Sequence, residues 1–245
     1  MKQTILTIKE NVALTSNVYK MLLEGDVSGV TNCGQFVNIK LDGLFLRRPI
    51  SVCDCEDGVL TLIYKVVGKG TEQMSKMGVG ETLDVLTGLG NGYDTSVSGE
   101  NPMLLGGGVG VPPMYMLCKK LIAEGKKVSV VLGFNTKDEI FYENEFKALG
   151  ADVTVTTVDG SYGVKGFVTD ALPTDYSYFY TCGPEPMLRA VYRATATSGQ
   201  FSFEERMGCG FGACMGCSCH VITGGYKRIC KDGPVLEKEE IVWDA

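Results

Sequence analysis

The sequence contains only one histidine, His220, among its 245 residues. A Rieske-type iron–sulfur centre takes two histidines on one of its irons, so this class of centre is excluded. We expect His220 to be an ordinary exposed or hydrogen-bonded side chain and not a metal ligand. The stretch 99–200 holds no histidine and no carboxylate pair arranged for hydrolysis, which argues against a hydrolase.

Long apolar runs and blocks of basic charge are also missing. No apolar stretch approaches the roughly 18 residues that a membrane-spanning helix needs, and the start of the chain alternates like a strand instead of forming a signal-peptide core. The formal net charge is −6, which argues against nucleic acid as a partner. We expect a cytoplasmic protein without a membrane or nucleic-acid partner.

Cysteine, by contrast, is abundant. The ten cysteines are not expected to form a disulfide framework, because the cytosol keeps thiols reduced. Cys209, Cys214 and Cys217 follow the spacing C-x4-C-x2-C, and Cys230 follows after twelve further residues. This is the plant-type spacing of thiolates that hold a [2Fe–2S] cluster. We therefore predict that these four cysteines are the cluster ligands.

Glycines between and beside these cysteines strengthen the prediction, because a residue without Cβ lets the backbone curl around a small object and point N–H groups at sulfur. They are Gly208, Gly210, Gly212 and Gly216. The alternative is a four-thiolate zinc site, which usually combines two C-x2-C pairs or one such pair with a histidine pair. The four-residue gap and the single distal cysteine favour iron–sulfur. Cys219 is interpreted as a packed residue on the strand that leaves this loop, with substitute ligation as the alternative.

Residues 1–98 are predicted to form short antiparallel strands that close into a barrel, because runs rich in Val, Ile, Leu and Thr are separated by glycine and Asp-Gly breaks. The predicted strands are Gln3–Asn11, Val18–Leu23, Gln35–Lys40, Ile50–Asp54, Val59–Val67 and Thr82–Leu86. A single helix is predicted over Thr71–Met77, with Thr71 as its N-cap.

Two stretches of this segment could hold a flavin that carries a diphosphate. Arg48, followed by Pro49 and Ser51, offers the side chain best suited to bidentate phosphate contacts. Gly70-Thr71 begins the predicted helix, where free N–H groups favour anions. Each stretch alone is equally compatible with a solvated turn or a simple helix cap.

Residues 99–200 show alternating strands and helices, which predicts a parallel sheet. The strands are expected at 101–105, 127–133, 152–158 and 176–181, and the helices at 112–124, 137–148, 166–171 and 188–197. Glycine-rich turns follow the first and fourth strands, where such folds bind nucleotides. The predicted nucleotide-binding residues are Gly106, Gly107, Gly108, Gly110, Cys182, Gly183 and Pro184. Helix capping is the alternative for either turn alone.

The order of these motifs resembles the ferredoxin–NADP⁺ reductase superfamily, and the C-terminal cysteine motif makes the whole chain similar to the electron-transfer subunits of NAD⁺-dependent class 1B dihydroorotate dehydrogenases. The resemblance implies an FAD-binding antiparallel β barrel over 1–98, an NAD-binding α/β domain over 99–200 and a [2Fe–2S] segment over 201–245. It also implies a set of flavin contacts, namely Arg48, Pro49, Ile50, Ser51, Ile63, Tyr64, Lys65, Gly70 and Thr71.

The resemblance further implies a partner and a function in pyrimidine biosynthesis. The partner is an FMN-containing catalytic subunit, in a heterotetramer with two copies of each chain. Electrons pass from its FMN through the [2Fe–2S] cluster and FAD to NAD⁺, because a flavin can exchange one electron with iron–sulfur and two with nicotinamide. The cluster loop, with Phe211 and Met215 exposed, is the expected docking face.

Two alternatives remain open at this point. One is a subunit of an NADH-dependent ferredoxin:NADP⁺ transhydrogenase or sulfide dehydrogenase, a group that tends to carry aspartate where this chain has Cys209. The other is a regulatory iron–sulfur module without turnover, which predicts that no flavin is bound.

Overall fold

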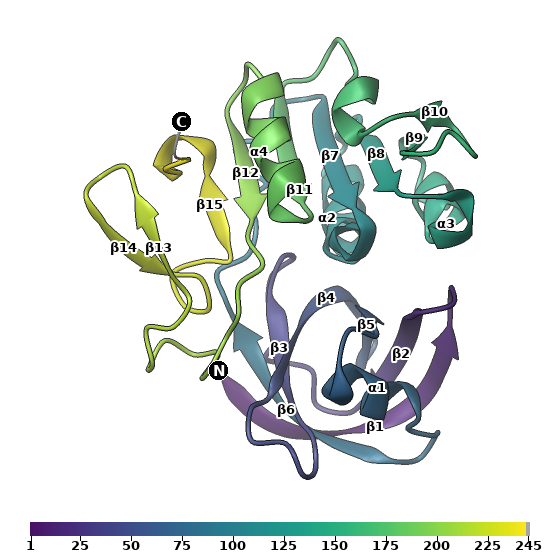
Figure 1. The fold of residues 1–245 in the computed structure, drawn as a ribbon, viewed down its shortest axis with the longest axis vertical. Coiled ribbons are helices and arrows are strands. Elements are labelled where there is room, and N and C mark those ends of the chain that lie inside the picture. Colours follow the sequence, from purple (N-terminus) through teal and green to yellow (C-terminus); the bar gives the residue numbers. More distant parts are fainter. Residues whose placement is uncertain (244–245) are drawn as a thin grey trace.

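A computed structural model describes residues 1–243 as a closed β barrel, a seven-stranded sheet flanked by helices and a small two-stranded hairpin (Figure 1). The barrel and the sheet lie one below the other in this view, and the hairpin projects to one side of both. In residues 1–243 no helix is long and apolar enough to cross a membrane.

The barrel consists of six antiparallel strands in the order β1-β2-β5-β4-β3-β6. Burial alternates along β6, so every second side chain points into the barrel core. Closure leaves no free strand edge. All six strands agree with the prediction apart from shifts at their ends; they are β1 (Lys2–Ala13), β2 (Val18–Glu24), β3 (Phe36–Lys40), β4 (Arg48–Glu56), β5 (Val59–Lys65) and β6 (Thr82–Leu89).

The barrel helix α1 (Lys69–Ser75) begins earlier than predicted, and Thr71 is not its N-cap. Gly68 takes the cap position in an extended conformation. The Thr71 hydroxyl instead accepts hydrogen bonds from the backbone N–H groups of Val67 at 3.0 Å and Gly68 at 3.3 Å. The Thr71 hydroxyl therefore satisfies the backbone N–H groups at the cap and just before it.

The α/β part forms a sheet in the order β10-β9-β8-β7-β11-β12-β15, parallel except for β15. Its strands are β7 (Pro102–Gly107), β8 (Ser129–Phe134), β9 (Asp152–Thr157), β10 (Val164–Lys165), β11 (Tyr178–Cys182), β12 (Gly199–Ser202) and β15 (Val235–Glu237). Strand β7 is buried throughout, because helices cover both faces of the sheet.

Helices α2 (Val111–Ala123) and α3 (Glu143–Ala148) pack on one face of the sheet, and α4 (Glu185–Ala194) packs on the other. The helix predicted over 137–148 is split into a 3-10 turn, Lys137–Glu139, and α3, because the backbone at Ile140 is extended. The helix predicted near 166–171 is a single 3-10 turn, Val168–Ala171.

Beyond the sheet strands, β13 (Ser218–Val221) and β14 (Gly225–Arg228) form the hairpin, and a last 3-10 turn spans Lys238–Glu240.

Polar contacts join the barrel, the sheet and the C-terminal segment. The Lys119 ammonium of α2 bonds the carboxylates of Asp54 at 2.8 Å and Glu56 at 2.9 Å on β4. Asn91, just after β6, exchanges side-chain hydrogen bonds with the backbone of Val235 at 2.8 and 3.1 Å. Strand β12 spans residue 200, where the α/β segment was expected to end. Strand β15, from the C-terminal segment, pairs with β12. Residues 235–237 are thereby built into the sheet.

Phe201 on β12 gives a test of this arrangement. Its ring is fully buried and packs edge-to-face on Phe179 at 5.3 Å between centroids. We predict that Phe201→Ala lowers the free energy of unfolding by about 3–5 kcal/mol, because it leaves a cavity in the core. The matched control is Phe45→Ala, at a fully exposed side chain, with an expected change within about 0.5 kcal/mol. Denaturant titrations of both variants measure the difference, and equal effects would contradict the proposed packing.

Candidate flavin and nucleotide cleft and cysteine centre

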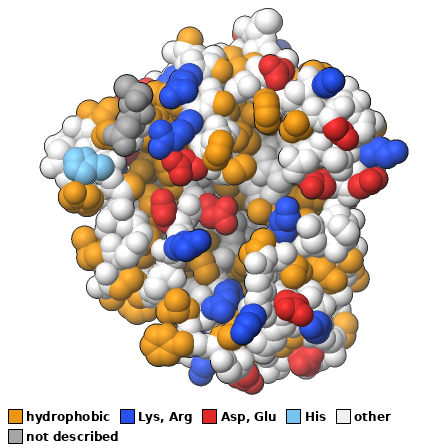
Figure 2. Space-filling view, in the orientation of Figure 1, with side chains coloured by type: hydrophobic (Ala, Val, Ile, Leu, Met, Phe, Trp, Pro, Cys, Tyr) orange, Lys and Arg blue, Asp and Glu red, His pale blue; other side chains and the backbone are white. Residues whose placement is uncertain are grey.

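A cavity of about 710 Å³ lies between the barrel and the sheet and is lined by residues from both. Figure 2 shows it as a hollow across the middle of the molecule, with acidic and basic side chains around its rim. Most of its lining surface is apolar. A predominantly apolar cleft with a few polar groups is the usual form of a cofactor site.

The barrel side of this cavity contains most of the predicted flavin contacts. They lie at the start of β4, the end of β5 and the start of α1: Arg48, Pro49, Ile50, Ser51, Ile63, Tyr64, Lys65 and Thr71. Strands β4 and β5 are neighbours, so the two stretches meet at one rim of the barrel. Tyr64 is only 2% exposed, and its hydroxyl donates to Asn11 Oδ1 at 3.0 Å, so this ring belongs mainly to the barrel core.

The sheet side of the cavity contains the two glycine-rich turns. Gly107, Gly108 and Gly110 follow β7, and Cys182, Gly183 and Pro184 follow β11. Strands β7 and β11 pair directly, with Cys182 opposite Gly106, so both turns meet at the carboxyl edge of the sheet.

Close backbone approach explains why glycine occupies these turns. A Cβ on Gly110 would lie 2.2 Å from the carbonyl oxygen of Cys182, and one on Gly107 would lie 2.3 Å from Met187 Sδ. Both distances are shorter than atoms tolerate. A larger residue at position 110 would push the two turns apart, because it would meet backbone, whereas at position 107 the Met187 side chain would have to move. The turns therefore leave their backbone open to a ligand in the cavity.

Two predicted residues do not line the cavity. Gly70 lies beneath the Arg48 side chain, where a Cβ would stand 2.1 Å from Nε of that arginine. Gly106 packs against α2, where a Cβ would stand 3.0 Å from the Cα of Val111. Both glycines permit tight packing behind the cavity wall, and Gly70 in particular lets the arginine lie across α1.

Several lining residues had no local sequence signal. They include Phe36 on β3, Asn135 and Glu139 after β8, Phe167, and the segment from Ser202 to Met207. The segment 202–207 is informative, because Cys209 follows it after one residue. The chain therefore runs from the cavity wall directly into the cysteine motif, a proximity that no residue pattern indicates.

Cys182 lies at the cavity and is buried, and burial raises the pKa of its thiol to about 12. A thiol with such a pKa stays protonated at neutral pH and is a poor nucleophile. This agrees with a role for Cys182 as part of the wall.

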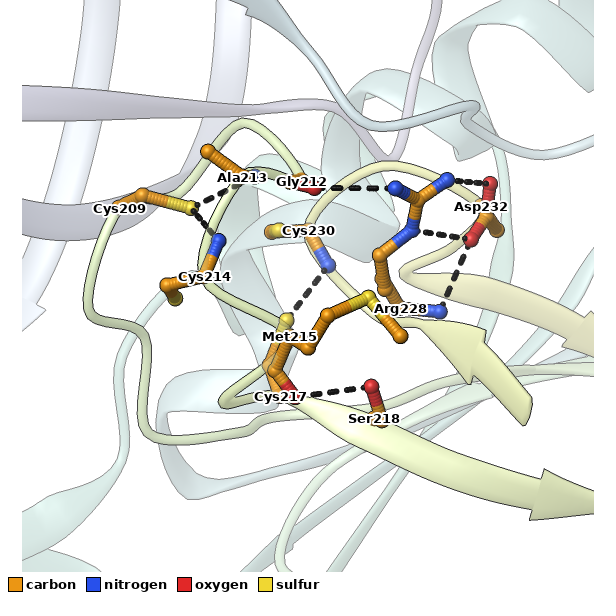
Figure 3. A network of polar contacts seen from close by, with 10 residues as sticks. All are labelled: Cys209, Gly212, Ala213, Cys214, Met215, Cys217, Ser218, Arg228, Cys230 and Asp232. Carbon is orange, nitrogen blue, oxygen red and sulfur yellow. Dashed lines mark hydrogen bonds and ion pairs between the residues drawn. The ribbon is translucent and has the colours of Figure 1, made fainter.

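The four cysteines of the motif lie together as two pairs on the loops around the hairpin (Figure 3). In the first pair, the Cys214 backbone N–H donates to Cys209 Sγ at 3.4 Å, and the Ala213 N–H donates to the same sulfur at 3.2 Å. In the second pair, the Cys230 N–H donates to Cys217 Sγ at 3.4 Å. The second pair is buried, whereas Cys214 is exposed.

The loop backbone fits a small inorganic group. A Cβ on Gly208 would lie 3.2 Å from Cys214 Sγ, and one on Gly216 would lie 3.5 Å from it. Gly210 has a positive φ of 77° and passes against the amide of Asn38 on β3, whose Nδ2 donates to the Cys209 carbonyl at 3.2 Å. The glycines thus keep the space beside the sulfurs free of side chains and seat the loop on the barrel.

The pKa values of Cys209 in the first pair and Cys230 in the second pair are shifted in opposite directions. Burial acts to raise the pKa of Cys209, but backbone N–H groups of Phe211, Cys214 and Ala213 outweigh it and lower the pKa to about 6. Burial and the neighbouring Cys217 thiol raise the pKa of Cys230 to about 12. Metal ligation requires thiolates, so Cys209 is ready to bind at neutral pH and Cys230 must lose its proton on binding.

The donor set is compatible with two irons that share four thiolates. Within residues 1–243, no group of three or more His, Cys, Asp or Glu side chains converges on one metal position. In a [2Fe–2S] cluster each iron takes two cysteines, which matches the pairing of Cys209 with Cys214 and of Cys217 with Cys230. Cys219 lies on β13, half-buried, and His220 beside it is exposed and packs on Tyr226.

Residues 104–193 match the oxidoreductase NAD-binding domain, and residues 204–242 match the iron–sulfur cluster binding domain of dihydroorotate dehydrogenase B. A solved structure of an NADH-dependent reduced ferredoxin-NADP oxidoreductase superimposes with a TM-score of 0.87 at 32% identity, covering 98% of this chain and 90% of that chain. The ferredoxin NADP⁺ reductase of Neisseria gonorrhoeae shares the fold alone, at 16% identity and a TM-score of 0.69, over 79% of this chain and 90% of that chain.

Fold and site together define an iron–sulfur flavoprotein oxidoreductase with a ferredoxin–NADP⁺ reductase-like core. The electron transfer subunit of dihydroorotate dehydrogenase B (NAD(+)) from Bacillus mycoides is 43% identical over 98% of both chains, and that of Bacillus pumilus is 44% identical over 98% of both. The chain belongs to this family of electron transfer subunits. Its cofactors are FAD, a [2Fe–2S] cluster and NAD, and its function is electron transfer in pyrimidine biosynthesis.

Two cysteine variants test the ligand set. We predict that Cys209→Ser loses the iron–sulfur absorption bands and most of its bound iron, because a hydroxyl is a poor substitute for a thiolate on iron. Cys219→Ser, only two residues beyond Cys217, is the matched control and should keep both. Visible spectra with iron and acid-labile sulfide analysis provide the readout, and an intact cluster in Cys209→Ser would show that the assignment is wrong.

Proposed function

We propose that this chain takes electrons from the FMN of a dihydroorotate-oxidising catalytic subunit and delivers them, through a [2Fe–2S] cluster and FAD, to NAD⁺. One observation carries the proposal: a single stretch of chain, 202–209, forms part of the cavity wall and ends at a cluster cysteine. Strand β3 also joins the cavity to the cysteine loop, because Phe36 lines the cavity and Asn38 bonds the Cys209 carbonyl.

The barrel rim is the proposed flavin site. Arg48 supplies the cation for the diphosphate, and Ser51 and Thr71 provide hydroxyls beside it. Ile63, Tyr64 and Lys65 present the end of β5 to the flavin ring system. The remaining proposed contacts are Pro49, Ile50 and Gly70, the last of which acts by allowing Arg48 to lie flat.

The carboxyl edge of the sheet is the proposed NAD site. The turn from Gly106 to Gly110 opens helix α2, whose N-terminus favours a diphosphate. Cys182, Gly183 and Pro184 form the facing wall. Because the proposed flavin and NAD sites line one cavity, the two reacting rings would lie side by side within it.

The four cysteines Cys209, Cys214, Cys217 and Cys230 are the proposed cluster ligands. When bound there, the cluster would supply one-electron transfer, which nicotinamide cannot perform, and a flavin would supply the conversion between single electrons and a hydride. The chain contributes the placement: the ligand loop rests on β3, and β15 after Cys230 returns to the sheet.

Exposed apolar side chains mark the proposed docking face for the catalytic subunit. Phe211 is 44% exposed and Met215 is 54% exposed on the ligand loop. Phe45, fully exposed, lies on the β3–β4 loop next to Arg47, whose Nη1 donates to the Asn38 carbonyl at 3.3 Å. Asn38 also bonds the ligand loop, so the β3–β4 loop and the ligand loop both contact this residue, and we include Phe45 in the proposed docking face.

We also propose a heterotetramer with two copies of each chain, and the assignment of 1–98 to flavin, 99–200 to NAD and 201–245 to the cluster. A cytoplasmic location is supported by ten cysteines that are all free thiols.

The second candidate function is that of an NADH-dependent ferredoxin:NADP⁺ oxidoreductase subunit, which the TM-score of 0.87 favours. Cys209 and the 43–44% identity to dihydroorotate dehydrogenase subunits favour the first.

Activity measurements separate these functions. We predict that the purified chain shows flavin and iron–sulfur bands and reduces artificial dyes with NADH, but does not oxidise dihydroorotate. Addition of an FMN-containing dihydroorotate dehydrogenase subunit should give dihydroorotate-dependent NAD⁺ reduction. Dihydroorotate oxidation by the isolated chain, or NADP⁺ reduction by ferredoxin, would contradict the proposal.

The docking face has its own test. We predict that Phe211→Asp, and separately Phe45→Asp, weakens binding to the catalytic subunit by roughly tenfold or more, because a charge replaces a buried apolar anchor. Dye reduction with NADH should be unchanged in both. Val79→Asp, at an exposed apolar residue between α1 and β6, is the control. Equal affinities for all three variants in a titration would place the interface elsewhere.

A further inference from the structure

One peptide group between the cluster cysteines is engaged at both of its polar ends (Figure 3). The Ala213 N–H donates to Cys209 Sγ at 3.2 Å, and the Gly212 carbonyl accepts from Arg228 Nη1 at 2.9 Å. This carbonyl and this N–H belong to the same planar peptide unit. Whatever fixes the oxygen therefore also fixes the direction in which the N–H points.

Arg228 is itself held rigidly. Its Nε and Nη2 donate to the two carboxylate oxygens of Asp232 at 2.9 and 3.2 Å, and its backbone N–H donates to Asp232 Oδ2 at 2.9 Å. Both residues flank Cys230, two positions before and two after it. The guanidinium thus ties the loop around one cysteine pair to the loop that carries the other.

These contacts form a continuous chain of hydrogen bonds. It runs from the Asp232 carboxylate through the Arg228 guanidinium and the Gly212–Ala213 peptide to Cys209 Sγ. A cation on the carbonyl oxygen draws electron density from the amide and makes its N–H a stronger donor, since hydrogen bonds in series polarise one another. Hydrogen bonds to cluster sulfurs are among the factors that set the reduction potential.

We propose that Arg228 is a positioning residue for the iron–sulfur centre. It aims the Ala213 N–H at Cys209 Sγ and strengthens this hydrogen bond, which favours the form that carries one more electron and raises the reduction potential. The inference rests on the proposed function in one respect, the presence of the cluster on these four cysteines. It goes further by assigning a role to a residue that binds neither the cluster nor the nucleotides.

The competing explanation is that Arg228 only closes the turn after β14. Under that explanation its removal would lower stability and leave the potential of any assembled cluster unchanged. The two explanations therefore differ in a quantity that can be measured independently of turnover.

The experiment is a redox titration of the full chain, monitored through the EPR signal of the reduced cluster, in Arg228→Met and Arg228→Lys. We expect a midpoint potential below that of the unmodified chain in both, with the larger drop in Arg228→Met. Arg228→Lys keeps the charge but loses the two-point grip on Asp232, so its shift should be smaller. Iron and sulfide per chain are measured in each variant.

Lys227→Met is the matched control. It removes one positive charge from the neighbouring residue, whose ammonium bonds the Glu240 carboxylate at 2.5 Å and not the ligand loop. Its potential should stay at the unmodified value. If the midpoint potential of Lys227→Met fell as far as that of Arg228→Met, net charge alone would explain the effect. That result would overturn the proposed path through the peptide.

The remaining outcomes are also decisive. Full iron content with an unchanged potential in the Arg228 variants would overturn the proposal. If Arg228→Met retains no cluster, the result for Arg228→Lys decides, and an unchanged potential in that variant would overturn the proposal equally. Absence of iron and sulfide from the unmodified chain would instead refute the proposed function, so the two failures are distinguishable.

Discussion

The structure depends on the seating of the cysteine loop against the barrel. Asn38, buried on β3, donates to the Cys209 carbonyl, and Gly210 passes so close to this amide that no side chain fits between them. Two strand positions earlier, Phe36 lines the cavity. A single strand thus holds both the cavity wall and the loop. Electron transfer between neighbouring centres needs short distances, and this contact holds the cysteine loop beside the strand that lines the cavity.

The cavity shows how close backbone approach substitutes for specific side chains. The turns after β7 and β11 meet so tightly that Gly107 and Gly110 leave no room for Cβ atoms, while Arg48 on the opposite wall reaches over Gly70. Polar side chains are few along an otherwise apolar surface. Because the cofactors carry the chemistry, the protein's contribution is position, exclusion of water and local charge.

The likeness to an NADH-dependent ferredoxin-NADP oxidoreductase, at 32% identity, shows that one architecture supports more than one electron route. This chain matches an NAD-binding domain and an iron–sulfur cluster binding domain, and a shared fold does not by itself fix the electron route that a protein serves. Phe45 and Phe211 are both exposed apolar side chains of this chain, and they belong to the docking face proposed above. Family membership at 43–44% identity agrees with a dihydroorotate-oxidising partner.

Local patterns in the sequence determined the barrel strands, the parallel sheet, the cysteine motif and the glycine-rich turns, since periodicity, spacing and glycine act over a few residues. They did not determine that Thr71 bonds backward from inside α1, or that residues 137–148 break at Ile140. Only the tertiary structure placed segment 202–207 in the cavity wall, paired the thiols, and set Arg228 on the Gly212 carbonyl. These contacts join residues far apart in the chain, and their energy comes from packing and hydrogen bonds that exist only after folding.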